Sequence, residues 1–246
     1  MSALDVVLLL GGGLVAGVIN TLAGGGSLIT VGLLVVAGVP GNVANGSNRV
    51  GVVAAGLTAA AGFRHLGVAG RRQAVPVLIP VVAGSVLGAL LIGGLTDDAF
   101  ERVFGLLMVP LLILLLRPPR QLAAGEREPW PRWALVSVFF AVGVYGGAFQ
   151  AGIGLILIVT LARSGIDLVL ANSIKVIVVL FVTATALPVF VARGDVDWGP
   201  ALVLAAGFAV GGWLGAHVTV VGGEKLIRAV MIAAVIALTG RLIGLY

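Results

Sequence analysis

Two basic residues of this chain lie beside long apolar segments, where burying a charge is costly. Arg49 and Lys175 are each followed by a long apolar run and preceded by small polar residues: Asn45, Ser47 and Asn48 in one case, Asn172 and Ser173 in the other. A charge within a membrane-like segment marks a functional site by default. We interpret each cation as standing at the start of a helix, where free N–H groups would help it to bind an anion. The alternative is that the cations extend to the membrane surface and the polar residues only cap helices.

A glycine-rich break precedes each polar cluster. The first break is NTLAGGGS (20–27) and the second is FQAGIG (149–154). Glycine weakens a helix by about 1 kcal/mol per residue, so each break should end a helix early. Asn20 and Gln150 either line a site or satisfy backbone groups freed by the break. The glycines either expose backbone N–H groups to a ligand or allow close helix packing. These glycines are Gly24, Gly25, Gly26, Gly152 and Gly154.

The two breaks and the two clusters form an internal repeat. AGGGSLI (23–29) corresponds to AGIGLI (151–156), and GSNRV (46–50) corresponds to NSIKV (172–176). Interrupted segments at corresponding positions of two halves are typical of secondary transporters. We therefore predict a first transmembrane repeat over 1–116, a cytoplasmic linker over 117–132 and a second transmembrane repeat over 133–246. We expect the breaks and clusters to meet near the middle of the membrane.

The composition is that of an integral membrane protein. The chain has 246 residues, of which 60% are hydrophobic and only 10% charged. Soluble domains carry about 25% charged residues. Apolar runs recur along the whole length, so we predict an all-α polytopic transmembrane bundle of 8 to 10 segments, some of them short or broken. The runs cover 5–22, 27–39, 50–63, 74–95, 102–116, 133–149, 155–162, 174–192, 198–220 and 226–244. Glycine pairs at 84–88, 207–211 and 211–215 indicate close helix packing.

The basic residues are explained by membrane topology. The net charge is +5, and its clustering in short loops follows the positive-inside rule rather than a nucleic-acid surface. Five crossings per half give inverted repeats, with three basic residues outside and ten in the cytoplasm. Four crossings per half give parallel repeats and a split of nine to four, so the inverted arrangement is slightly favoured. Its cytoplasmic residues are Arg64, Arg71, Arg72, Arg117, Arg120, Arg127, Arg132, Arg163, Lys225 and Arg228.

Several kinds of chemistry lack the residues they need. The chain has no cysteine, and we find no HExxH motif, no paired buried carboxylates and no GK[ST] sequence after the glycines. We therefore expect no catalytic residues, no metal site, no cofactor and no enzymatic activity. The acidic residues lie in loops or at helix ends, which argues against a cation as substrate.

The chain resembles the sulfite exporter TauE/SafE family, also called toluene sulfonate uptake permeases. The resemblance is carried by residues 13–68, which include NTLAGGGSLITVG and NGSNRVG, and more loosely by 144–180, GDVDW (194–198) and GGWLGAHV (211–218). It implies transport of sulfur-containing anions, such as sulfite or sulfonates, across the bacterial inner membrane. By position, it places Asn20, Asn45, Ser47, Asn48, Arg49, Gln150, Asn172, Ser173 and Lys175 around the site.

The resulting prediction is a multi-pass transporter of small anions that works by alternating access. An anion channel and a membrane subunit without a substrate of its own stay open as alternatives. The expected partners are a small anionic substrate and the lipid bilayer, with no nucleic acid. The sequence leaves open the identity of the anion, the direction of transport, the coupling ion and the choice between a monomer and a homodimer.

Overall fold

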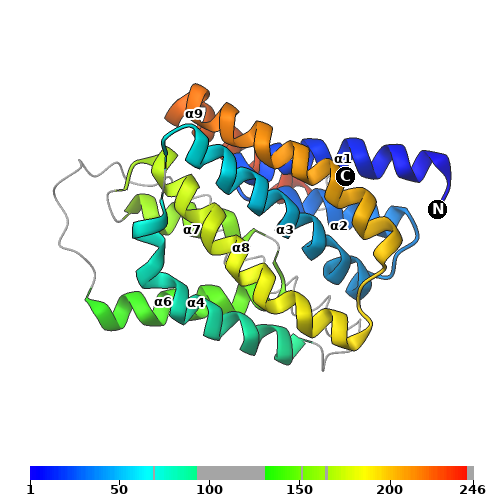
Figure 1. Cartoon of the computed structure of the whole chain (residues 1–246), viewed down its shortest axis with the longest axis horizontal. Coiled ribbons are helices and arrows are strands. Elements are labelled where there is room, and N and C mark those ends of the chain that lie inside the picture. The colour runs from blue at the N-terminus through cyan, green and yellow to red at the C-terminus, as the bar shows by residue number, and fades with distance from the viewer. Residues whose placement is uncertain (69, 93–130, 151, 164–165, 243–246) are drawn as a thin grey trace.

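The computed structural model describes residues 1–68, 70–92, 131–150, 152–163 and 166–242. All secondary-structure elements in these ranges are α-helices (Figure 1). They are α1 (Ala3–Leu22), α2 (Gly26–Val36), α3 (Gly41–His65), α4 (Arg71–Ile92), α6 (Arg132–Ala148), α7 (Ile153–Arg163), α8 (Leu168–Arg193) and α9 (Trp198–Leu242). The predicted run at 102–116 and nearly all of the predicted linker 117–132 lie outside the described residues.

Among the described residues, four segments are long and apolar enough to cross a membrane. They are Ala3–Leu22, Arg71–Ile92, Leu168–Arg193 and Trp198–Gly223. Helix α6 is also apolar but has 17 residues. Helix α3 has 25 residues, yet its polar cluster lowers its mean hydropathy well below that of its neighbours. The long helix with the most polar composition is therefore the one that carries Arg49.

Both predicted breaks are present as tight turns between two helices. Helix α1 ends at Leu22, and α2 then runs back along it, with Gly26 packed against Ala16 and Gly12 against Leu33. Helix α6 ends at Ala148, and α7 begins at Ile153. We call these units the first hairpin (α1–α2) and the second hairpin (α6–α7). Each turn holds residues at positive φ, a conformation that suits glycine: Gly24 in the first, Gln150 and Gly152 in the second.

Small residues let the helices of the two halves pack closely. Gly207 and Gly211 of α9 lie against the backbone of Leu10 and Leu14 in α1. Gly84 and Gly88 of α4 lie in the same way against α6. The prediction that these glycines serve packing is therefore confirmed, as expected for helices that associate without a hydrophobic driving force. The first helix of the first hairpin thus packs against α9 of the second half, and the first helix of the second hairpin packs against α4 of the first half.

The contacts also fix the direction of the helices. Helices α1 and α9 are parallel, because residue numbers increase together along their contacts. The same holds for α3 with α9, for α4 with α6 and for α4 with α8. Helices α3 and α8 run in opposite directions, because Gly46 near the start of α3 meets Phe190 near the end of α8, whereas Gly56 meets Leu180. Helices α1, α3 and α9 therefore run opposite to α4, α6 and α8 (Figure 1).

One end of the bundle is basic. Helix α3 ends there with Arg64, and α4 begins there with Arg71 and Arg72. Arg132 begins α6, which is parallel to α4, and Arg163 ends α7 just before α8 begins at the same end. Arg193, at the end of α8, lies at the opposite end.

The structure corrects two predicted boundaries. Helix α3 begins at Gly41 and not near residue 50, and α8 begins at Leu168 and not near 174. Pro40 and Asp167 are the N-cap residues, and the Asp167 carboxylate accepts bonds from two backbone N–H groups. Arg49 and Lys175 therefore lie about two turns inside their helices, and the prediction that they begin helices is wrong. The predicted division between the runs at 198–220 and 226–244 is confirmed, because Gly223 has a non-helical backbone conformation that divides α9 into two helices at a kink.

Candidate functional site

The tips of the two hairpins touch each other. Gly24 and Gly154 meet backbone to backbone, so closely that a Cβ on either residue would overlap the Cα of the other. Only glycine permits this approach, and Gly24 also has a φ of 83°. The two breaks, 130 positions apart in the chain, therefore share one place in the fold.

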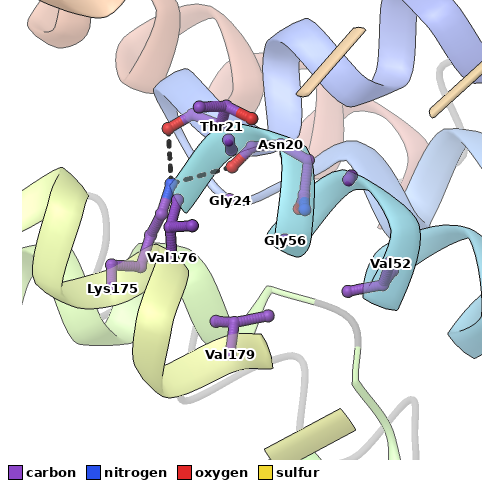
Figure 2. A pocket seen from close by; sticks show the side chains of 10 residues that line it. Asn20, Thr21, Gly24, Val52, Gly56, Lys175, Val176 and Val179 are labelled. Atoms are coloured by element: carbon purple, nitrogen blue, oxygen red, sulfur yellow. Dashed lines mark hydrogen bonds between the residues drawn. The ribbon is translucent and has the colours of Figure 1, made fainter. Parts of the chain in front are cut away.

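Lys175 binds the end of the first hairpin's long helix. Its Nζ donates hydrogen bonds to the carbonyl oxygens of Asn20, at 2.8 Å, and Thr21, at 2.6 Å (Figure 2). The side chain is 1% exposed. These carbonyls belong to the last turn of α1, where the unpaired C=O groups carry partial negative charge. A cation of the second half thus stabilises a helix end of the first half.

Arg49 makes the reciprocal contact. One terminal nitrogen donates to Gly146 O and to Gln150 Oε1, and the other donates to Gly147 O and Ala148 O, at 2.7–3.3 Å. All three carbonyls lie in the last turn of α6. The Phe190 ring lies over the guanidinium, with its centroid 4.2 Å from Cζ, and the side chain is fully buried.

The neighbouring amides and hydroxyls repeat this crossed pattern. Asn45 donates to Ala148 O, the last carbonyl of α6, and Asn172 donates to Leu22 O, the last carbonyl of α1. Ser47 accepts from the backbone N–H of Asp197, directly before α9. Ser173 accepts from the N–H of Gly70, directly before α4. Each polar cluster therefore binds two parts of the other half. One is the end of the first helix of the hairpin, and the other is the residue directly before a long helix, α9 or α4.

The positive charges at these two clusters are not neutralised by carboxylates. Within the described part of the chain, neither Arg49 nor Lys175 forms an ion pair, and carbonyl dipoles and one amide oxygen are their polar partners. Burying a charge without an opposite charge is costly. Four buried side-chain atoms near them also have no hydrogen-bond partner: Asn45 Oδ1, Asn48 Nδ2, Arg49 Nε and Asn172 Oδ1. Buried polar atoms are normally paired, so these four unpaired atoms distinguish the two clusters from an ordinary core.

A small pocket opens beside Lys175 (Figure 2). Its polar lining comes from Asn20, Thr21 and Lys175, and the rest comes from Gly24 and apolar residues of α3 and α8: Val52, Ala55, Gly56, Ala59, Val176 and Val179. The free space corresponds to about one water molecule. This free space is smaller than an oxyanion.

The predicted site residues divide into four groups. Asn20, Gly24 and Lys175 border the pocket, and Asn45, Arg49 and Gln150 surround the tip of the second hairpin. Asn172, Ser173, Ser47 and Asn48 hold neighbouring elements, with Asn48 accepting a bond from the Thr30 hydroxyl. Gly25 is the N-cap of α2, Gly26 packs on α1, and Gly152 sits in the second turn.

Sequence reasoning missed Thr183 and Phe190. Gln150 donates to the Thr183 hydroxyl at 2.7 Å, and Phe190 covers the Arg49 guanidinium. A single hydroxyl or ring in an apolar helix gives no signal of its own. The described residues contain no group of three His, Cys, Asp or Glu side chains that could hold a metal ion.

Comparison with known proteins agrees with this architecture. A family model described as "Sulfite exporter TauE/SafE" matches residues 9–242. The chain belongs to this family. A "Probable membrane transporter protein" of Haemophilus influenzae is 28% identical over 94% of this chain and 91% of its own length. "Probable membrane transporter protein ORF9" of a Sinorhizobium species is 26% identical, over 94% of this chain and 89% of its own.

A third TauE/SafE relative is "Probable membrane transporter protein YfcA" of Escherichia coli K12, which is 25% identical over 94% of this chain and 86% of its own length. No solved structure matches the chain significantly. Together with the four membrane-spanning segments, these matches show that the chain is a multi-pass membrane protein of a transporter family.

Proposed function

We propose that this TauE/SafE protein is a secondary transporter of small anions in the bacterial plasma membrane, and that its substrates are sulfur oxyanions or organosulfonates such as sulfite. The observation that carries the proposal is the pair of buried cations without carboxylate partners at the two hairpin tips. Only an anion, or carbonyl dipoles in its place, can offset their charge. The family's description supports the choice of sulfur chemistry.

We also propose that the two halves are inverted repeats with five crossings each. Corresponding helices run in opposite directions, α1 against α6, α3 against α8 and α4 against α9. The basic end of the bundle then faces the cytoplasm, because cytoplasmic loops carry an excess of Lys and Arg. This agrees with the topology that places Arg163 with Arg64, Arg71 and Arg72, and Arg193 outside.

In the transport mechanism that we propose, the substrate anion competes with the carbonyl oxygens at the helix ends for binding to the buried cations. The free space in the pocket is smaller than an oxyanion, so the anion must replace carbonyl ligands as it enters. A carbonyl released from its cation frees the end of a hairpin helix. Binding of the anion is therefore linked to movement at the tips, which alternating access requires.

Reconstitution of the purified protein into liposomes tests this function. We expect saturable uptake of radiolabelled sulfite or methanesulfonate that is accelerated when the same unlabelled anion is present on the other side. Ohmic single-channel currents would instead favour the channel. A folded protein that moves no anion would favour a subunit without a substrate of its own.

The double variant Arg49→Ala, Lys175→Ala should reduce this uptake to the level of empty liposomes. No positive charge is then left at the clusters to compensate the anion for the hydration that it loses on leaving water. Gel filtration in detergent and circular dichroism establish whether the variant is folded. Normal uptake by this variant would contradict the proposed role of the two cations.

A further inference from the structure

We infer that the two cation sites have different roles: the anion binds at Lys175 together with the amide of Asn20, whereas Arg49 is a structural residue that keeps the second hairpin in place. The inference rests on the proposed function and assigns its binding site to one of two related clusters. It follows from how the two clusters differ.

The two cations differ in how many of their hydrogen-bond donors remain unused. A lysine ammonium has three N–H donors, and Lys175 uses two of them on Asn20 O and Thr21 O. The terminal nitrogens of Arg49 have four N–H donors, and all four are used on Gly146, Gly147, Ala148 and Gln150. The remaining Arg49 donor, Nε–H, is buried in a side chain already covered by Phe190. Of these two cations, Lys175 is the one whose unused donor lies at the pocket described above.

The hairpin residues facing the cations differ as well. Leu22 and Ala148 both end their helices and both accept from a buried asparagine, so they correspond, and Asn20 corresponds to Gly146. Asn20 is half-buried and borders the pocket, and its side-chain amide forms no hydrogen bond to the described part of the chain (Figure 2). Gly146 has no side chain to offer. The first hairpin thus presents a free amide beside a cation, and the second does not.

The space beside Arg49 is filled. Gly56 of the pocket wall lies seven positions after Arg49, and Val182 of α8 lies seven positions after Lys175, so these two residues correspond. An added Cβ at Gly146 would overlap Ile153 and would lie 2.9 Å from Val182, so these two side chains occupy the place that the pocket occupies in the other half. Gln150 also fills it, since its amide joins Arg49 to Thr183. Gln150 holds a φ of 62°, which is strained for a residue other than glycine.

This asymmetry gives the hairpins different roles. An anion at Lys175 would take the place of the Asn20 and Thr21 carbonyls, and so release the end of α1. The end of α6 stays held by three bonds to Arg49, which also binds Gln150 in the turn that follows. The first hairpin is therefore the element that responds to substrate, and the second is the fixed element against which it moves.

Thermal unfolding of the purified protein tests this assignment, with sodium sulfite or sodium methanesulfonate as the probe and sodium gluconate as the ionic-strength control. Asn20→Ala should weaken the apparent affinity at least about tenfold, while its melting temperature without the probe stays that of the wild type. Asn20→Asp should abolish the response and raise the melting temperature, because its carboxylate would neutralise Lys175. Thr183→Val is the matched control beside Arg49: it should melt lower but bind with unchanged affinity.

The outcomes separate the two proposals. If no probe anion stabilises the wild type, both the proposed function and the assignment are overturned. If the wild type responds but Asn20→Ala responds equally, or Thr183→Val loses affinity as much as Asn20→Ala does, the assignment alone is wrong. In that case the anion is shared by both clusters or bound at the second.

Discussion

Replacing Gly24 with alanine is expected to destabilise the protein by about 3–5 kcal/mol, although only one methyl group is added. Two costs combine at this position. Gly24 has a φ of 83°, which costs a residue with a Cβ roughly 1–2 kcal/mol. The new Cβ would also overlap the backbone of Gly154 at the tip of the second hairpin, and backbone cannot move aside as a flexible side chain can. The measurement is the melting temperature and the midpoint of denaturant unfolding in detergent.

The chain contains a control for each cost. Gly38 has nearly the same φ, 86°, but a Cβ there would meet nothing within 4 Å, so Gly38→Ala should cost only about 1 kcal/mol. Gly154 makes the same contact as Gly24 without a positive φ, so Gly154→Ala should fall between the two. Equal melting temperatures for Gly24→Ala and Gly38→Ala would mean that the hairpin tips do not touch.

The parts of this site that the sequence predicted are those with a local signal. A run of glycines interrupts a membrane helix wherever it occurs, so both turns could be placed to within a few residues. A buried Arg or Lys is conspicuous in a chain with only 10% charged residues. The order of break and cluster in both halves followed from comparing the sequence with itself.

The partners of these residues could not be predicted in this way. Arg49 donates mainly to backbone carbonyls almost a hundred positions away, and every residue has a carbonyl. Nothing in the side chains of Gly146 or Gly147 marks them as acceptors. The same limit explains the wrong helix starts, because Asn45 and Asn172 are common N-cap types but here bind the ends of other helices. Interpreting them as caps was reasonable locally and wrong in the tertiary structure.

The difference between the two polar clusters could not be predicted from the sequence either. In sequence, Asn20 and Gln150 are amides at corresponding breaks, and we gave them the same two alternatives. In the structure Asn20 is free beside the pocket, whereas Gln150 is bound on both sides. The side chain of Gln150 thus binds two side chains rather than backbone groups freed by the break, whereas Asn20 borders the pocket.

Replacing Arg49 with methionine is expected to lower the stability by about 3–5 kcal/mol, comparable to breaking a buried ion pair. Methionine fills a similar length with apolar atoms but donates nothing. Gly147 O and Gln150 Oε1 would then stay buried without a described donor, whereas Gly146 O keeps the bond from the Gln150 N–H and Ala148 O keeps the bond from Asn45. Each unpaired group costs about 1–3 kcal/mol, partly offset because the guanidinium no longer has to be buried without a counter-charge.

Arg193→Met is the matched control, because Arg193 also donates from both terminal nitrogens to helix carbonyls, those of Ala89 and Leu90 at the end of α4. Arg193 is exposed at the opposite end of the bundle, where water can replace its bonds, so its loss should cost within about 1 kcal/mol. Arg49→Lys separates charge from geometry: it keeps the cation but cannot span four acceptors, so it should melt between the wild type and Arg49→Met. If Arg49→Met and Arg193→Met melt at the same temperature, Arg49 does not hold the second hairpin. A melting temperature of Arg49→Lys equal to that of the wild type would show that charge alone holds the helix end, and the four-bond geometry would then add nothing.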